Sequence, residues 1–146
     1  MKAIKLFDEF LKQGIVKKQS PDKSRAEFLI KESEICLEGL NERVKVMGIN
    51  EKNANSIIKD CYDILMELIR AKMLLDGYNA SGFGAHEAEV AYLRILNLKE
   101  SEIQFTDQLR YFRNGMIYYG KILDKEYAEK VIEFTKNSYK KLINLI

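Results

Sequence analysis

The residues most capable of chemistry lie together between positions 105 and 121, in a segment with helical periodicity. On a helix that turns about 100° per residue, five polar or basic residues of this segment fall on one side. They are Arg110, Arg113, Asn114, Tyr118 and Lys121. A guanidinium, an amide and a phenol that share a helix face can bind an anion, and an ordinary solvated polar face is the alternative.

The opposite side of the same helix is apolar. Its residues follow one another at intervals of four and three, which places them in one narrow stripe. They are Phe105, Leu109, Phe112, Met116 and Tyr119. Because an apolar stripe must face a core, we expect the arginines of this helix to face solvent.

The helices that must hold this segment are indicated by their end signals. Ser20-Pro21 is typical of a helix start, Gly48 ends that helix, and Asn50 is expected to cap the next one. The second long helix runs to Asp76, where Gly77 suits the left-handed position that terminates helices. Since only a few residues join these two helices, they should be antiparallel neighbours.

The remaining signals complete a helical bundle. A short helix is expected within 3–15 and another over 87–97, and Ser101 with Gln104 forms a capping-box pattern ahead of the key helix. Asp124 should cap the last helix. No segment alternates with a period of two. We therefore predict an all-α fold: an up-and-down helical bundle of four main helices plus one or two short ones, as a single domain over 1–146 with residues 1–19 forming a short helix on the bundle.

Composition excludes several classes of function. The net charge of +2 is too small for a protein that grips duplex DNA through many phosphates. Cys36 and Cys61 are isolated, and the only histidine, His86, has no partners at metal-ligand or catalytic-triad spacing, so we expect no metal and no cofactor. His86 is interpreted as a local hydrogen-bonding residue. Without a long apolar run or an N-terminal leader, the chain is expected to be cytoplasmic and to have no membrane partner.

Three stretches resemble the HEPN family of small prokaryotic helical domains, over about residues 22–146. They are the helix YDILMELIRAKMLLDGYN at 62–79, the turn containing His86-Glu87, and RNGMIY at 113–118. The family motif is an arginine, a polar residue and, four residues later, a histidine. Arg113 and Asn114 are similar to its first two positions, whereas Tyr118 stands where the histidine is expected.

The resemblance implies a homodimer formed through the Arg113 helices, with Arg113 contacting phosphate and Asn114 positioning the ligand. Arg113, Asn114 and Tyr118 are thus the catalytic candidates, and Arg110 and Lys121 of the same helix face are expected to bind phosphate beside Arg113. Active HEPN members are metal-independent ribonucleases, many of them toxins with a nucleotidyltransferase partner. At pH 7 only about one phenol in a thousand is ionised, so Tyr118 is a poor replacement for an imidazole base. Three hypotheses remain: a catalytically degenerate module that binds RNA, a nucleotide or a protein; a metal-independent endoribonuclease; and a homo-oligomerising structural protein.

Overall fold

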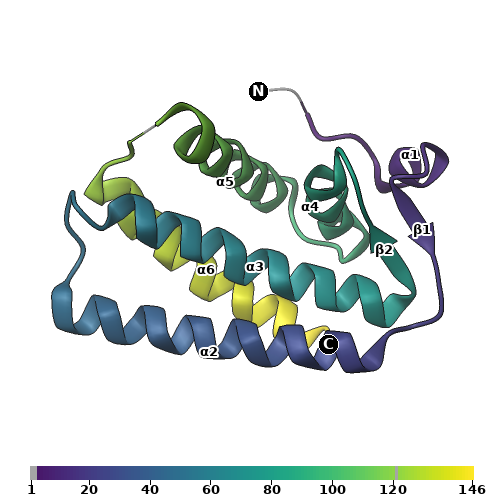
Figure 1. Cartoon of the computed structure of the whole chain (residues 1–146), viewed down its shortest axis with the longest axis horizontal. Coiled ribbons are helices and arrows are strands. Elements are labelled where there is room, and N and C mark those ends of the chain that lie inside the picture. Colours follow the sequence, from purple (N-terminus) through teal and green to yellow (C-terminus); the bar gives the residue numbers. More distant parts are fainter. Residues whose placement is uncertain (1–2, 121) are drawn as a thin grey trace.

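The part of the chain that the structure describes is a bundle of six helices with one small two-stranded sheet, which confirms the predicted all-α class (Figure 1). The computed structural model describes residues 3–120 and 122–146, and for 117–119 it describes the backbone alone. The elements in chain order are α1 (Phe7–Lys12), β1 (Val16–Lys18), α2 (Lys23–Met47), α3 (Ala54–Asp76), β2 (Tyr78–Ala80), α4 (Ala85–Ile95), α5 (Glu100–Tyr119) and α6 (Lys125–Asn144).

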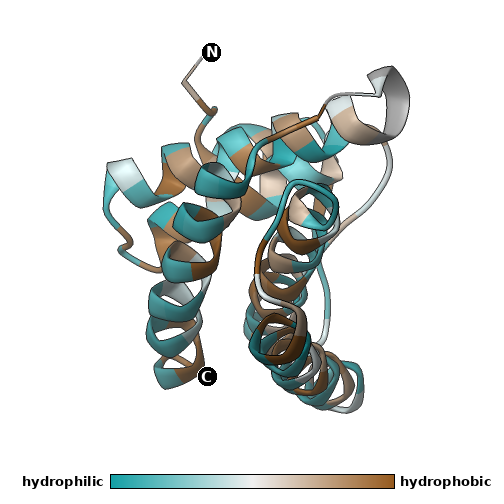
Figure 2. Cartoon of the chain, turned by 90° about the vertical axis from the view of Figure 1, so that its left-hand side faces the viewer, coloured by the Kyte–Doolittle hydropathy of each residue, from teal (hydrophilic) through white to brown (hydrophobic). Residues whose placement is uncertain are grey.

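Helix α3 is the centre of the molecule. It packs against α2, α4, α5 and α6, and its buried residues extend around most of the helix, from Ala54 to Leu74. In Figure 2 the hydrophobic residues of α6, the helix that ends at the C-terminus, lie mainly on the side that faces the rest of the bundle. A helix with neighbours on several sides can present only narrow strips to solvent, and most charged residues of α3 are accordingly half-buried.

Helix α2 runs antiparallel to α3 as predicted, but it buries little of itself. Its three fully buried residues are Ala26, Ser33 and Leu40, spaced seven apart along one line. Ser33 satisfies its hydroxyl inside the helix by donating to the Ile30 carbonyl at 2.7 Å. Met47, the last residue of the helix, is 63% exposed.

The N-terminal segment differs from the prediction of one short helix over residues 1–19. Of its described residues, 3–19, only Phe7–Lys12 is helical, and Val16–Lys18 then pairs antiparallel with Tyr78–Ala80 of the glycine-containing loop. The Phe7 ring packs against the rings of Tyr78 and Tyr92, at centroid distances of 5.3 and 4.8 Å. The strand was missed because its three residues find their hydrogen-bond partners about 60 residues further along the chain, which no local pattern encodes.

Several helix ends were predicted correctly and others moved by a few residues. Gly48, Gly77 and Gly120 cap the C-termini of α2, α3 and α5. Gly77 has φ +86°, and a Cβ there would lie 2.8 Å from the Gln19 carbonyl oxygen. Asp124 caps α6 by accepting a hydrogen bond from the Tyr127 amide at 2.8 Å.

Four predicted helix starts are corrected by the structure, and at two of them a carboxylate accepts a free backbone amide. Asp22 rather than Ser20 caps α2, since its carboxylate accepts from the Arg25 amide at 3.1 Å. Asn53 occupies the cap position of α3, and the Asn50 side chain instead closes the preceding turn. Helix α5 begins at Glu100, where the carboxylate of Glu102, not Gln104, reaches back to the Lys99 amide at 3.2 Å. Helix α4 begins at Ala85, two residues before the predicted start.

Candidate functional site

Helix α5 is buried on two sides, so its arginines do not face open solvent as predicted. The expected apolar stripe is partly correct: Leu109 is fully buried, and Phe105 packs on Phe134 of α6 with ring centroids 4.4 Å apart. The adjoining side of the helix is buried as well, because it contacts α3 and α4. There the side chains of Arg110 and Arg113 are only 18% and 29% exposed.

The other predicted site residues of this helix have different surroundings. Arg110 forms ion pairs with two acids: its Nε lies 2.8 Å from Asp107 Oδ1, and its Nη1 lies 3.8 Å from Glu87 Oε1. Asn114 is half-buried. The side chain of Tyr118 and the whole of Lys121 lie outside the described residues.

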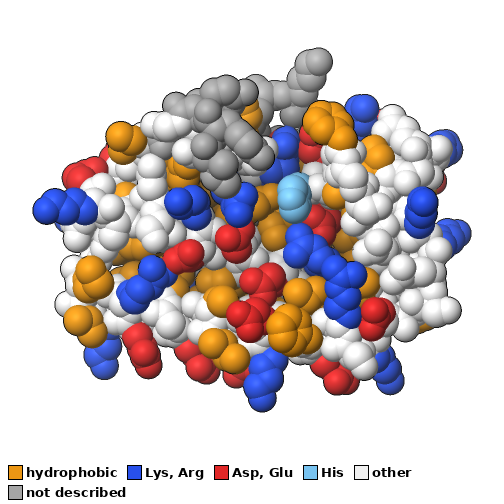
Figure 3. All heavy atoms as spheres, in the orientation of Figure 1, with side chains coloured by type: hydrophobic (Ala, Val, Ile, Leu, Met, Phe, Trp, Pro, Cys, Tyr) orange, Lys and Arg blue, Asp and Glu red, His pale blue; other side chains and the backbone are white. Residues whose placement is uncertain are grey.

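Arg113 opens onto a small pocket between three helices. The pocket has a volume of about 300 Å³ and receives residues from α3, from the first turn of α4 and from α5. Its described lining consists of Tyr62, Asp63, Met66, Glu67, Arg70, His86 and Arg113. Basic, acidic and histidine side chains gather in the middle of the face of the molecule shown in Figure 3.

Two residues that line this pocket each have a buried side-chain donor with no hydrogen-bond acceptor among the described residues. The first is the hydroxyl of Tyr62, a residue that is only 3% exposed. The second is Nε of Arg113, which forms an ion pair with Asp63 at 3.0 Å without the alignment of a hydrogen bond. The Arg113 guanidinium also lies 5.7 Å from the centre of the Tyr62 ring, a distance that suits a cation–π contact. Buried donors of this kind are favourable only when an acceptor arrives.

One wall of the pocket is a buried network centred on Glu89. Its carboxylate accepts from Arg70 through Nε at 2.6 Å and Nη2 at 3.2 Å, and it lies 2.9 Å from His86 Nδ1. Burial alone would raise the pKa of Glu89, but the hydrogen bonds from His86 and Arg70 and the charge of Arg70 hold it below its usual value. Because Glu89 is therefore ionised and can only accept, His86 Nδ1 carries a hydrogen.

Glu67 has the opposite environment. Burial, followed by the nearby charges of Glu32 and Asp63, raises the pKa of its carboxyl group above the ordinary value of 4.5. Its Oε2 atom is buried without a hydrogen-bond partner among the described residues. The carboxylate form of Glu67 is thus unfavourable in this position, and a positive charge or a proton relieves it.

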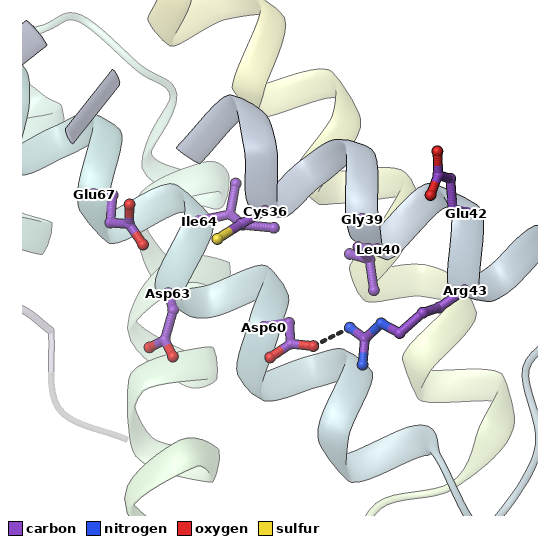
Figure 4. A pocket seen from close by; sticks show the side chains of 9 residues that line it. All are labelled: Cys36, Gly39, Leu40, Glu42, Arg43, Asp60, Asp63, Ile64 and Glu67. Atoms are coloured by element: carbon purple, nitrogen blue, oxygen red, sulfur yellow. Dashed lines mark hydrogen bonds and ion pairs between the residues drawn. The ribbon is translucent and has the colours of Figure 1, made fainter. Parts of the chain in front are cut away.

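Asp60, Asp63 and Glu67 form an acidic row along α3. A second hollow lies on the other side of this row, between α2 and α3. It has a volume of about 530 Å³ (Figure 4). Figure 4 shows Arg43 of α2 reaching across to Asp60, with Cys36 and Ile64 further along the groove. Burial, followed by the charges of Glu67 and Glu32, raises the pKa of the Cys36 thiol, so its reactive thiolate form is disfavoured.

Sequence reasoning missed most of the pocket, although a signal was present. Tyr62, Met66 and Arg70 are four residues apart and therefore lie on one side of α3, as Asp63 and Glu67 do beside them. A strip of charged and hydroxyl-bearing residues on an otherwise apolar helix marks the side where a polar site is enclosed. His86, interpreted from the sequence as a local hydrogen-bonding residue, does bond locally to Glu89 and also lines the pocket with Arg113.

The described residues contain no group of histidine, cysteine and acidic side chains arranged to hold a metal ion. In the same part of the chain, no helix is both long and apolar enough to cross a membrane. Comparison with protein-family models, with curated proteins and with solved structures found no match to this chain.

Proposed function

We propose that the protein is a HEPN-like module that binds a phosphate group of RNA or of a nucleotide in the pocket between α3, α4 and α5. The observation that carries the proposal is that two residues lining one pocket, Tyr62 and Arg113, each have a buried donor, the hydroxyl and Nε, without an acceptor among the described residues. A phosphate has the acceptor oxygens and the negative charge that such a site lacks.

The charges of the pocket explain how an anion would enter. Arg70 is committed to Glu89 by two hydrogen bonds, whereas Arg113 has a single ion pair with Asp63, whose side chain is 47% exposed. An exposed carboxylate is a weakly held partner that solvent can replace. A phosphate therefore competes with Asp63 for Arg113 and leaves the buried Arg70–Glu89 pair intact.

The resemblance to HEPN domains, centred on Arg113 and Asn114, supports RNA or a nucleotide as the source of the phosphate. It also leads us to propose a homodimer, and a nucleotidyltransferase as a possible partner protein. The pocket itself is complete within one chain as far as its described lining extends.

The direct test is a binding titration of a labelled mixed-sequence RNA oligonucleotide, with ATP as a competitor, against the wild-type protein and Arg113→Ala. Since a hydrogen bond to a charged group is worth about 1.5–3 kcal/mol, the substitution should weaken binding about 10- to 100-fold. Arg43→Ala is the matched control, because Arg43 also pairs with an aspartate of α3 but lies in the other groove.

Equal binding by the wild-type protein and Arg113→Ala would contradict the proposal. Failure of the wild-type protein to bind either probe would also contradict it, and would favour a structural role in oligomerisation.

A further inference from the structure

We propose that a second copy of this chain docks along the exposed side of α2, so that the two α2 helices form a two-fold symmetric, antiparallel pair. This inference does not rest on the proposed function, because the described lining of the pocket beside Arg113 includes no residue of α2. The contact is also separate from the Arg113 helix, through which the HEPN resemblance implies a dimer.

Four residues of α2 form an exposed line along most of the helix. At about 100° per residue, they fall within about 20° of one direction. They are Phe28, Ile35, Gly39 and Val46, called here the α2 line. Its three apolar side chains are 65%, 53% and 84% exposed. In the described part of the chain α2 packs extensively on α3 alone, and Figure 1 shows it along the lower edge of the molecule. Apolar side chains repeated along one exposed side of a helix indicate a surface that binds a partner.

Gly39 indicates that this partner approaches closely. A glycine inside a helix lowers the stability of the helix relative to alanine. The described residues give no steric reason for it, since Gly39 is exposed and a Cβ added there would meet nothing within 4 Å. The absence of a side chain does allow a bulky residue of another chain to lie against the backbone of α2 at this point.

The spacing of the α2 line is symmetric about Leu37. Ile35 and Gly39 lie two residues on either side of it, and Phe28 and Val46 lie nine residues on either side. An antiparallel α2 related by a two-fold axis at this level therefore sets Ile35 opposite Gly39 of the partner subunit. Phe28 likewise lies opposite Val46 of the partner subunit. A parallel pair would set Gly39 against Gly39 of the partner subunit and leave a gap, so the antiparallel pair packs better.

Two hollows along this side of α2 can receive the partner's side chains. Gly39 lines the groove of about 530 Å³ between α2 and α3 (Figure 4), so Ile35 of the partner subunit enters this groove. A further hollow of about 400 Å³ is lined by Phe28, Ile35 and polar residues of the same helix. Val46 of the partner subunit lies opposite it. The apolar residues of one copy thus face the hollows of the other.

The charges beside the α2 line are complementary across the same axis. Glu32 and Arg43 lie on one flank of the line, whereas Lys31 and Glu42 lie on the other. A two-fold axis between antiparallel helices brings equal flanks together, so Glu32 meets Arg43 of the partner subunit. On the other flank Lys31 meets Glu42 of the partner subunit. Each pair is offset by one residue, about 1.5 Å along the helix. The existing pair of Arg43 with Asp60 is exposed and leaves the guanidinium able to meet a second acid. Because the surface complements itself, its occupant is a second copy of the chain.

The test is the mass of the protein in solution, measured by sedimentation at increasing concentration for the wild type and Gly39→Phe. The added ring has room in the single chain, but in the pair it occupies the position of Ile35 of the partner subunit. Gly39→Phe should therefore keep the wild-type melting temperature and associate at least 10-fold more weakly, so that its mass is half that of the wild type or less. Asn41→Phe is the matched control: it adds the same ring at an exposed position on another side of α2 and should keep the wild-type mass.

Reversal of single charges tests the pairing. Lys31→Glu and Glu42→Lys each bring like charges together, and each should weaken association about 10-fold. The double variant Lys31→Glu, Glu42→Lys restores opposite charges and should recover most of the wild-type affinity. Single and double variants with equal affinity would contradict the pairing.

Cysteine cross-linking tests the orientation. In a Cys36→Ser background, Phe28→Cys and Val46→Cys proteins should form a disulfide with each other when they are mixed, because these positions face each other in the antiparallel pair. A parallel pair would instead cross-link each variant with itself. Amide exchange in α2 should also slow as the concentration of the wild type rises, since the partner covers the helix, and should stay unchanged in Gly39→Phe.

Three results would overturn the inference. They are a wild-type protein of single-chain mass at concentrations up to about 100 µM, equal masses for the wild type and Gly39→Phe, and cross-links of each cysteine variant with itself alone. Equal masses above that of a single chain would place the contact elsewhere, for example at the Arg113 helices. Binding of RNA beside Arg113 is measured separately and stands or fails on its own.

Discussion

The pocket beside α5 and the groove beside α2 are two hollows on either side of one acidic row. In each, an arginine from a flanking helix reaches an aspartate of α3: Arg113 meets Asp63, and Arg43 meets Asp60. The pocket adds the buried Glu89 network and two donors without acceptors, whereas the described groove has one exposed ion pair and a disfavoured thiolate. Both hollows contain an arginine–aspartate pair, so this pair does not distinguish the proposed binding pocket from the groove. The Glu89 network and the buried donors distinguish them.

The largest difference between the two regions should appear in stability. Glu89→Ala removes the partner of Arg70 from a buried position and should cost about 3 kcal/mol of unfolding free energy. Asp60→Ala removes half of an exposed pair and should cost less than about 1 kcal/mol. Denaturant titrations of both variants measure the two costs. Equal costs would mean that the Glu89 network contributes no more to the unfolding free energy than a surface ion pair.

Glu67 lines both hollows, and removing its charge should raise the stability of the protein by less than Glu89→Ala lowers it. Its pKa is raised in the folded protein, so the folded state holds the extra proton and stability falls as the pH rises from about 4.5 through the raised value. Glu67→Gln should therefore stabilise the protein at pH 7, by about 0.5 kcal/mol, the usual scale of a partly exposed substitution.

Thermal unfolding at pH 7 and at pH 4 measures this effect. The gain in melting temperature should be present at pH 7 and largely absent at pH 4, where Glu67 is mostly protonated in both states. A gain that is the same at both pH values would show that the charge of Glu67 is not its cause.

The smallest effect concerns the thiols. Cys36 should react with iodoacetamide more slowly than free cysteine, because burial and the charges of Glu67 and Glu32 raise the pKa of its thiol. Glu67→Gln should speed this labelling, since one of those charges is removed. Cys61, fully buried and with a pKa raised to about 11 by burial, should stay unlabelled in the native protein. Mass spectrometry of a labelling time course separates the two, and faster reaction of Cys61 would contradict the packing around it.

The sequence predicted what local chemistry determines. Gly77 and Asp124 mark helix ends because a left-handed backbone and an unpaired amide each need a particular residue type at that point. The four long helices followed from apolar spacing for the same reason. The orientation of α5 was predicted only in part. The periodicity revealed the apolar stripe that contains Leu109, but it did not indicate that the side chain of Arg113 would also be largely buried.

The candidate site depends on contacts between distant segments, which explains why Arg113 was found and its companions were not. Tyr62 and Arg70 lie in a helix that is buried on most sides, where hydrophobic periodicity cannot distinguish one face from another. Glu89 lies in a short helix and is only 2% exposed, with its carboxylate bonded to Arg70 and His86.

The few fully buried residues of α2, which are Ala26, Ser33 and Leu40, have a consequence for how the molecule opens. Helix α2 packs extensively on α3 alone, so it can detach while the other helices stay packed around α3. Amide hydrogens of α2 should therefore exchange with solvent by a partial opening that costs less than global unfolding. Those at the centre of α3, around Ile64 and Leu68, should exchange only when the whole bundle unfolds.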